Sequence, residues 1–348
     1  MIHRPRLALT QGDPAGIGPE ILLKLLAAQA GQDTDQRSWT PLLIAERAAL
    51  EPLRATVPIS SEAPWDRFRF LGSAPTRADL DALPADDIPV LDPVGSRRAL
   101  TFGASGPADA AGAMAALDAG IAAVRSGAAD ALVTAPVSKE SIARQLLPGF
   151  KGHTDYLAEA CGLERYGRDY LMAFLAPELQ VALLTVHVPL REAIETAVDA
   201  AAIAEALDCL HRHAGGKIAL AGLNPHAGEG GLLGAEDGRF LAPAVAAARA
   251  RGLDVHGPES ADSLFARARR GEFDWVLALY HDQGLIAVKT SSFGLATNWT
   301  LGLPFLRTSV DHGTAFALAG TGRADAGPLQ AVVDTTLELI AGSLPKRR

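Results

Sequence analysis

Short apolar runs that each end at a polar residue constrain the fold of this chain most strongly. The runs cover residues 131–137, 181–186, 218–223 and 275–280, and the residues that follow them are Ser138, His187, Asn224 and His281. Helical periodicity fills several of the intervals, including residues 190–214 and 239–251. Because strands that alternate with helices form layered sheets, we expect an α/β protein with a mostly parallel sheet.

The N-terminal part of the chain shows the same alternation. We expect strands at residues 6–9 and 41–45 and helices at residues 18–30 and 108–126. In the last of these segments, apolar residues recur at intervals of three and four, which is helical spacing. Two segments rich in proline and acidic residues, 60–66 and 86–96, are expected to be surface connections.

The length and charge of the chain limit its organisation and its partners. The chain has 348 residues, which fits roughly two domains of ~150 residues each. Apolar residues make up 48% and charged residues 21%, so the chain is not mainly disordered. The formal net charge of −8 argues against nucleic acid or an anionic membrane as the main partner. A local basic pocket for a small anion is compatible with this overall charge.

The cysteines and the N-terminus indicate the compartment. Cys161 and Cys209 form no CxxC pair, which argues against a disulfide framework and against a cysteine-rich zinc site. The first residues contain no long apolar region with a small-residue cleavage site, and no run of ~18 apolar residues occurs. We therefore expect a soluble cytoplasmic protein.

Three histidines, His187, His226 and His281, follow the ends of separate apolar runs. Ligands of open α/β sheets bind beyond the carboxyl ends of the strands, so these imidazoles would converge if the runs share a sheet or meet across a subunit interface. Three imidazoles bind a divalent metal well and leave positions open for a substrate. Any single histidine is more often a surface or hydrogen-bonded residue. His256 also follows a short apolar run, and the pattern alone does not exclude it.

Residues 12–20, G-D-P-A-G-I-G-P-E, form a glycine- and proline-rich loop between a strand and a helix. The loop matches neither the dinucleotide fingerprint nor the P-loop, because its glycines have a different spacing and no Gly-Lys-Ser/Thr follows. Its glycines and the amides of the next helix would allow close approach of an anion. A tight structural turn accounts for the same pattern equally well.

Several polar residues are candidates for binding an anionic substrate. They are His153, Thr154, Lys289, Asn298 and Arg307. Thr154 is predicted to cap a helix, and His153 and Thr154 would then donate hydrogen bonds to an anion at the helix N-terminus. The lysine, asparagine and arginine provide the cations and donors that a phosphorylated substrate needs. Asp262 and Asp282 would complete a metal shell or orient an imidazole, although Asp262 also fits a helix cap.

Five long motifs extend the pattern over nearly the whole chain, from residue 12 to about residue 339. They are G-D-P-A-G-I-G-P-E, K-G-H-T-D, L-N-P-H-A-G-E-G-G, Y-H-D-Q-G and L-G-L-P-F-L-R-T-S-V-D-H-G-T-A. In these motifs the chain resembles the 4-hydroxythreonine-4-phosphate dehydrogenase family of pyridoxal phosphate biosynthesis. The resemblance implies a fold similar to isocitrate and isopropylmalate dehydrogenases, which are two-domain α/β homodimers with a cleft between the domains. We expect the domains at residues 1–128 plus 305–348 and at residues 129–304.

The resemblance also implies roles for the candidate residues. It implies His187, His226 and His281 as metal ligands at a dimer interface, and it leaves His256 out. Substrate contacts are implied for His153, Thr154, Lys289, Asn298 and Arg307, and catalytic roles for His153, Asp282 and Lys289. The general base stays open among His153, Asp282 and a metal-bound hydroxide. The cofactor is NAD or NADP, with its binding residues unassigned, and the metal is Zn²⁺, Mg²⁺, Mn²⁺ or Co²⁺.

The reaction implied by the resemblance has two steps. Hydride leaves C3 of 4-phosphooxy-L-threonine for the cofactor, and the β-keto acid then loses CO₂ to give 3-amino-2-oxopropyl phosphate. Related enzymes oxidise threonate or erythronate 4-phosphate, and one distant branch oxidises a cyclic dihydrodiol dicarboxylate. Ser138 and residues 293–298 depart from the family pattern and leave the amino acid and the sugar acid both open. From the residues alone, a three-histidine metallohydrolase or a phosphate-binding protein without turnover fits as well.

Overall fold

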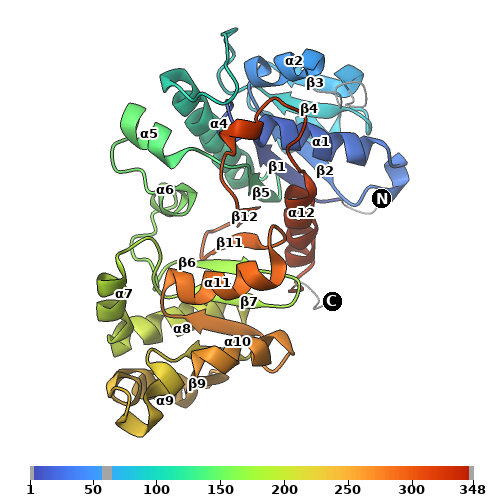
Figure 1. Cartoon of the computed structure of the whole chain (residues 1–348). Coiled ribbons are helices and arrows are strands. Elements are labelled where there is room, and N and C mark those ends of the chain that lie inside the picture. The colour runs from blue at the N-terminus through green and yellow to red at the C-terminus, as the bar shows by residue number, and fades with distance from the viewer. Residues whose placement is uncertain (1–3, 57–64, 345–348) are drawn as a thin grey trace. The chain divides into compact units, whose positions relative to one another are not determined.

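The chain forms two compact units in the computed structural model, which describes residues 4–56 and 65–344 (Figure 1). Unit 1 contains the residues up to Leu157 together with Phe305–Ser343, and unit 2 contains Ala158–Pro304. The sequence places the first boundary at residue 128, and the structure moves it to Leu157. The reason is that β5 (Ala131–Thr134) pairs with β1 (Arg6–Thr10) and with β12 (Leu306–Val310), and both partners belong to unit 1.

The strands of unit 1 form parallel pairs throughout. Their order is β3 (Phe68–Leu71), β4 (Ile88–Leu91), β2 (Thr40–Ile44), β1, β5 and β12. β1, β4 and β5 are buried at every position, as expected for a parallel sheet covered on both faces.

Three long helices, α1 (Gly18–Ala30), α4 (Pro107–Arg125) and α12 (Gly327–Ile340), pack on the strands of unit 1. The shorter helices of this part of the chain are α2 (Arg47–Thr56), α3 (Arg77–Asp81), α5 (Lys139–Gln145) and α6 (His153–Ala160), which extends past the boundary at Leu157. Leu7, Leu9 and Val133 belong to the apolar core that includes residues of α1 and α12, which lie side by side in Figure 1. The alternate residues Thr10 and Leu132 point to the other face, where α4 approaches so closely that a Cβ at Gly120 would lie 2.7 Å from each.

The strands of unit 2, unlike those of unit 1, include antiparallel pairs. The order of the unit 2 strands is β11 (Thr297–Leu301), β6 (Leu171–Leu175), β7 (Gln180–Leu183), β10 (Trp275–Ala278), β8 (Ile218–Ala221) and β9 (Val255–Glu259). β6 runs antiparallel to β7 and to β11, whereas β7, β10, β8 and β9 form parallel pairs. The predicted α/β class with a mostly parallel sheet is therefore confirmed.

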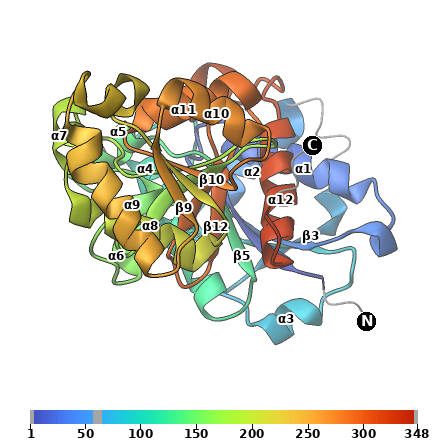
Figure 2. The same cartoon turned by 90° about the horizontal axis from the view of Figure 1, so that it is seen from below.

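Four helices pack on the strands of unit 2, namely α8 (Ala200–Ala214), α9 (Ala242–Ala250), α10 (Ala261–Arg269) and α11 (His281–Ser292). The helix before them, α7 (Leu190–Ala197), packs on α8. Figure 2 shows α8 beside α9, and α8 also contacts β6 and β11. α11 places Leu285 and Val288 in the core with β7 and β10. Within the described ranges, every helix is too short or too polar to span a bilayer.

Three predicted segments differ from the structure. Residues 190–214 form two helices, because Asp199 accepts hydrogen bonds from the amides of Ala201 and Ala202 and so starts α8. In the segment 239–251, α9 begins only at Ala242, after a π-type turn. The connection expected at residues 86–96 contains buried β4, since its apolar residues outweigh the flanking acids. Of the segment 60–66, residues 60–64 lie outside the described residues.

Candidate active site

Two histidines of unit 2 lie side by side at the carboxyl ends of neighbouring strands. His187 follows β7 and His281 follows β10, and these two strands are adjacent and parallel. The pairing continues past the strands, because Leu184 N donates to Ala278 O at 2.8 Å and Thr185 Oγ1 donates to Leu279 O at 2.8 Å. As a result the two imidazole centroids are 5.6 Å apart, with ring planes 43° apart.

Asp282 and Gln283 fix the position of His281. The Asp282 carboxylate lies 2.7 Å from His281 Nδ1, which favours the tautomer that leaves the Nε2 lone pair available. Gln283 accepts from Leu279 N at 2.7 Å and donates to Gly222 O at 2.9 Å, so it ties the start of α11 to the ends of β10 and β8. His187, His281 and Asp282 line a cavity of about 270 Å³ within unit 2.

His226 lies in a left-handed turn that Asp237 supports. Residues 226–230 all have positive φ, between 46° and 81°, although His226, Ala227 and Glu229 carry side chains. Asp237, which is fully buried, accepts hydrogen bonds from Leu223 N at 2.8 Å, Asn224 N at 3.0 Å and Asn224 Nδ2 at 2.8 Å. A hydrogen bond from Ser260, aided by the nearby His226, lowers the pKa of Asp262.

The donor types fit a divalent metal, but one chain brings together only part of the predicted ligand set. Over residues 4–56 and 65–344, no three histidine, cysteine, aspartate or glutamate side chains are grouped closely enough to hold a metal ion. His187 and His281 are adjacent, and His226 is not grouped with them. Two imidazoles, one of them oriented by a carboxylate, are the ligands that Zn²⁺ and Co²⁺ favour.

Lys289 and Asn298 are further candidate residues of unit 2. Lys289 lies two turns after His281 on α11, so the two side chains share one face of the helix. They line a cavity of about 460 Å³ together with Asp282 and Phe293. Asn298 lies on β11, and its Oδ1 atom is buried without a hydrogen-bond partner among the described residues. This buried acceptor is suited to a donor from a bound molecule.

Unit 1 holds a separate buried cationic group. Arg307 of β12 is 1% exposed and donates from Nη2 to Thr134 Oγ1 at 2.6 Å, at the end of β5. Burial lowers the pKa of Arg307 to about 9, so the guanidinium stays charged at neutral pH. Burial, with the charges of Arg307 and Lys139, holds the pKa of His153 well below its ordinary 6.5. His153 Nε2 is buried and has no hydrogen-bond partner in the described part of the chain. This group suits an anion.

Lys139, which lies near His153, is a further candidate site residue that sequence reasoning missed. It begins α5 after the apolar run of β5, and burial lowers the pKa of its ammonium group. Its side chain covers Gly152, where a Cβ would lie 2.9 Å from Lys139 Cε. The only signal in the sequence is its place after a buried strand, which it shares with many surface lysines.

Two predicted helix caps are corrected by the structure. α6 begins at His153, so Gly152, with φ of 142°, precedes the helix and Thr154 lies buried in its first turn. α10 is preceded by Ser260, and Asp262 lies in the first turn with its carboxylate 2.6 Å from Ser260 Oγ. In both places the helix starts two residues earlier than the capping pattern predicts.

Backbone amides of the Gly/Pro loop at residues 12–20 are engaged in hydrogen bonds to other backbone carbonyls of unit 1. Asp13 N donates to Pro136 O, Gly16 N to Asp13 O and Ile17 N to Thr314 O, at 2.8–3.0 Å. A Cβ at Gly12 would lie 2.2 Å from Pro136 O, which explains the glycine. These contacts favour the interpretation as a tight structural turn.

His256, which the apolar-run pattern alone does not exclude as a metal ligand, pairs with an acidic side chain: its Nε2 lies 2.9 Å from Asp254 Oδ1.

A mostly parallel α/β scaffold with imidazoles, lysines and an arginine at its strand ends is typical of enzymes that act on small anionic molecules. The family comparison is more specific. Residues 38–336 match the family model described as pyridoxal phosphate biosynthetic protein PdxA, and the chain belongs to this family.

Curated relatives match over nearly their whole length. The 4-hydroxythreonine-4-phosphate dehydrogenase of Acidithiobacillus ferrooxidans is 41% identical over 350 residues, which cover 98% of each chain. The enzyme of the same name from Neisseria meningitidis serogroup A is 40% identical and covers 99% of this chain and 100% of the relative. The predicted membership of the family is therefore confirmed.

Solved structures agree with this assignment. A 4-hydroxythreonine-4-phosphate dehydrogenase from Klebsiella pneumoniae has a TM-score of 0.81 at 33% identity and covers 97% of this chain and 98% of its own. A terephthalate 1,2-cis-dihydrodiol dehydrogenase from Burkholderia xenovorans has a TM-score of 0.60 at 27% identity, with coverage of 98% and 99%.

Proposed function

We propose that the chain is an oxidoreductase that oxidises C3 of 4-phosphooxy-L-threonine with NAD or NADP in pyridoxal phosphate biosynthesis. The oxidised product then loses CO₂ to give 3-amino-2-oxopropyl phosphate. Relatives of about 40% identity over nearly full length support the choice of substrate. The structural observation that carries the proposal is the group formed by the buried guanidinium of Arg307, the buried Nε2 atom of His153 and the nearby Lys139, because a phosphate or carboxylate would satisfy it.

Five residues are assigned to substrate binding. They are His153, Thr154, Lys289, Asn298 and Arg307. Arg307 offers a fixed charge, because its bond to Thr134 leaves the guanidinium plane held in one orientation. His153 is neutral and offers Nε2 for a hydrogen bond, and burial together with two nearby cations lowers its pKa and makes it a poor proton acceptor at neutral pH. Because a low pKa weakens His153 as a base, we add Lys139, whose pKa is lowered by burial, as a fourth candidate general base beside His153, Asp282 and a metal-bound hydroxide.

The metal residues proposed are His187, His226 and His281. His187 and His281 are the two imidazoles that lie together, and both would hold the metal. Asp282 would orient the His281 ring. When bound, a divalent metal would polarise the substrate hydroxyl and stabilise negative charge on its oxygen. The imidazole ligands favour Zn²⁺ or Co²⁺ over Mg²⁺ and Mn²⁺, which prefer oxygen ligands.

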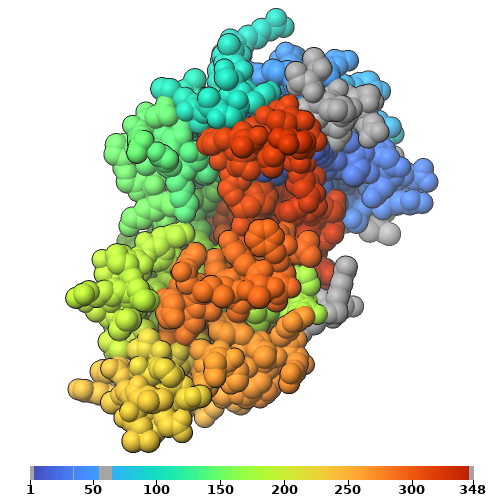
Figure 3. All heavy atoms as spheres, in the orientation of Figure 1, coloured from blue at the N-terminus to red at the C-terminus, as the bar shows by residue number. Residues whose placement is uncertain are grey.

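A homodimer with the active site at the subunit interface is part of the proposal. Large apolar side chains are exposed around the imidazole pair and Lys289, namely Val188, Leu190, Ile194, Ile286 and Phe293. Figure 3 shows the segment that contains α11, in orange, at the surface. An apolar surface of this kind is typical of a protein contact, and a second copy would also complete the metal ligand set.

Reduced-nicotinamide absorbance tests the activity. Purified protein would be mixed with NAD or NADP, Co²⁺ or Zn²⁺, and either 4-phosphooxy-L-threonine or D-threonate 4-phosphate, with an EDTA-treated control. We expect metal-dependent reduction of the cofactor with the amino acid. Turnover of the sugar acid alone would overturn the substrate and point to Ser138 and residues 293–298. Product release without cofactor reduction would indicate a hydrolase.

The metal assignment has its own test. His226→Ala should remove stoichiometric metal from the purified protein, as measured by elemental analysis, whereas His256→Ala should keep it. Retention of metal by His226→Ala would contradict that ligand. The cytoplasmic location expected from the sequence stays a prediction.

A further inference from the structure

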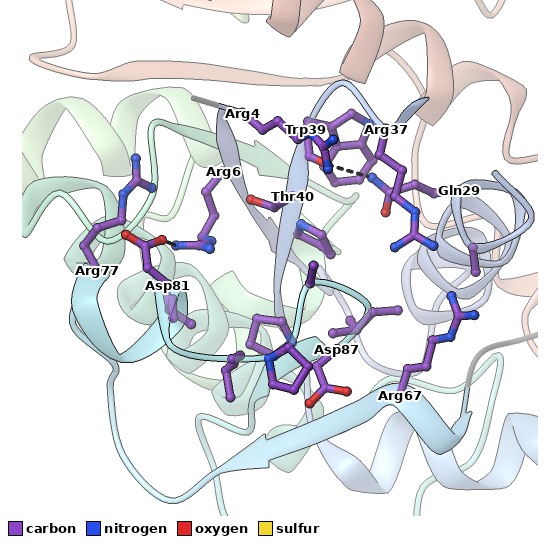
Figure 4. A pocket seen from close by; sticks show the side chains of 18 of the residues that line it. Arg4, Arg6, Gln29, Arg37, Trp39, Thr40, Arg67, Arg77, Asp81 and Asp87 are labelled. Atoms are coloured by element: carbon purple, nitrogen blue, oxygen red, sulfur yellow. Dashed lines mark hydrogen bonds and ion pairs between the residues drawn. The ribbon is translucent and has the colours of Figure 1, made fainter. Parts of the chain in front are cut away.

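Five arginines line a pocket of about 720 Å³ in unit 1, apart from every residue assigned above (Figure 4). They are Arg4, Arg6, Arg37, Arg67 and Arg77. Arg6, Thr40 and Ile88, which also line the pocket, are the first residues of β1, β2 and β4. The pocket is therefore at the amino ends of these strands. Thr134 and Lys139 of the candidate active site follow the opposite, carboxyl end of the same parallel sheet.

Four of the five arginines have exposed carboxylate partners, and the fifth, Arg77, pairs with the half-buried Asp130. The side chains of Arg6 and Arg37 are only 9% and 10% exposed, whereas their partners Asp81 and Asp86 are 60% and 53% exposed. Hydrated carboxylates neutralise a buried cation weakly, because water screens the pair. In Figure 4, Arg37 and Arg67 reach toward each other from opposite sides of the pocket.

Three of these guanidinium groups keep donors without an acceptor. Among the described residues, Arg6 Nε, Arg37 Nε and Arg67 Nη1 are buried and make no hydrogen bond. Arg67 Nη1 lies 3.7 Å from Asp86 Oδ1, too far for a hydrogen bond. Buried charged donors are normally satisfied, so their grouping around one cavity indicates a missing anionic acceptor.

We propose that this pocket binds a small organic phosphate. The donors come from three separate arginines, which suits the several oxygens of a tetrahedral phosphate better than one planar carboxylate. The remaining wall includes three carboxylates, Asp35, Asp81 and Asp87, and apolar residues such as Trp39, Pro84 and Pro89 that would accommodate an apolar portion of the same ligand. A cavity of this volume is in the range of small-molecule sites.

Calorimetric titration of the full chain with phenyl phosphate tests the proposal, and phenol is the uncharged control. Arg37→Gln with Arg67→Gln should weaken phenyl phosphate binding by at least about tenfold. The matched control is Arg47→Gln with Arg144→Gln, which removes two arginines of unit 1 outside the pocket and should change the affinity by less than about twofold. Phenol should not bind saturably.

Two results would overturn the proposal. One is the absence of saturable phenyl phosphate binding to the wild-type chain. The other is binding that survives Arg37→Gln with Arg67→Gln but is lost in Lys289→Ala, which would place the phosphate at the candidate active site. If the double variant does not fold, Arg37→Lys replaces it, since it keeps the charge but loses the guanidinium Nε. Unchanged affinity in Arg37→Lys would equally contradict the proposal.

Discussion

Individual side chains in unit 1 show how burial sets the chemistry of an anion site. Arg307 stays charged because its pKa, although lowered by burial to about 9, remains above neutral pH. Burial, together with the charges of Arg307 and Lys139, keeps His153 neutral. The site therefore combines fixed positive charge with an uncharged imidazole. This arrangement attracts an anion without placing a third positive charge beside the first two.

The neutral state of His153 makes stability depend on pH. Below about pH 6.5 the imidazole takes up a proton in the unfolded chain but not in the folded chain, so the free energy of unfolding falls as pH decreases. The slope from this one residue is at most about 1.4 kcal/mol per pH unit. Urea unfolding of the wild type and of His153→Gln at pH 7.5 and 5.5 measures it. An equal decrease in both proteins would contradict a depressed pKa.

Arg307→Lys tests whether the planar guanidinium matters. Lysine keeps the positive charge but cannot bond to Thr134 and to a substrate oxyanion with one rigid fork. We expect KM for the phosphorylated substrate to rise roughly tenfold or more. Thr134→Val, which removes only the orienting bond, should have the smaller effect. A KM unchanged in Arg307→Lys would remove Arg307 from the binding site.

Among the elements, the left-handed turn that carries His226 is the most constrained. Four residues in or beside it, Asn224, Gly228, Gly234 and Asp237, pack so closely that Gly228 has no room for a side chain: a Cβ there would lie 2.7 Å from Gly234 O. Gly230 has a similar positive φ but open space around its Cβ position. Substitutions at these two glycines therefore measure the cost of positive φ separately from the cost of steric overlap.

Gly228→Ala and Gly230→Ala form a matched pair. Both should lose about 1–2 kcal/mol of unfolding free energy, because alanine disfavours positive φ. Gly228→Ala should lose a further ~1–3 kcal/mol from overlap with Gly234. Urea denaturation measures both. Equal losses would contradict the close packing of this turn.

The sequence predicts those elements whose local pattern matches their tertiary role. His187 and His281 could be recognised because each follows an apolar run, and adjacent parallel strands bring such positions together. β4 was missed because Pro89 and the neighbouring acids resemble a loop. Lys139 could not be found, because its proximity to His153 is a tertiary property that no local spacing reveals. The separation of His226 from the other two imidazoles is likewise a tertiary property.

At the scale of the whole molecule, the proposal requires two copies of the chain. Ile286 and Phe293 are 65% and 86% exposed on and just after α11, close in sequence to Lys289. Such exposure of large apolar side chains beside candidate catalytic residues favours a covered interface.

Ile286→Asp with Phe293→Asp should convert the dimer to a monomer and abolish activity, because charges would be buried in an apolar contact. Sedimentation velocity measures the oligomeric state, and Val94→Asp, an exposed apolar position in unit 1, is the control. A dimer in the double variant would place the interface elsewhere.

The most direct measurement is the fate of the hydrogen at C3 of the substrate. The protein would be incubated with 4-phosphooxy-L-threonine carrying deuterium at C3, NAD or NADP and Co²⁺, and the reduced cofactor would be analysed by mass spectrometry. We expect deuterium in the reduced nicotinamide and one CO₂ for each cofactor reduced. Turnover that leaves the cofactor oxidised, or reduced cofactor without deuterium, would contradict hydride transfer from C3.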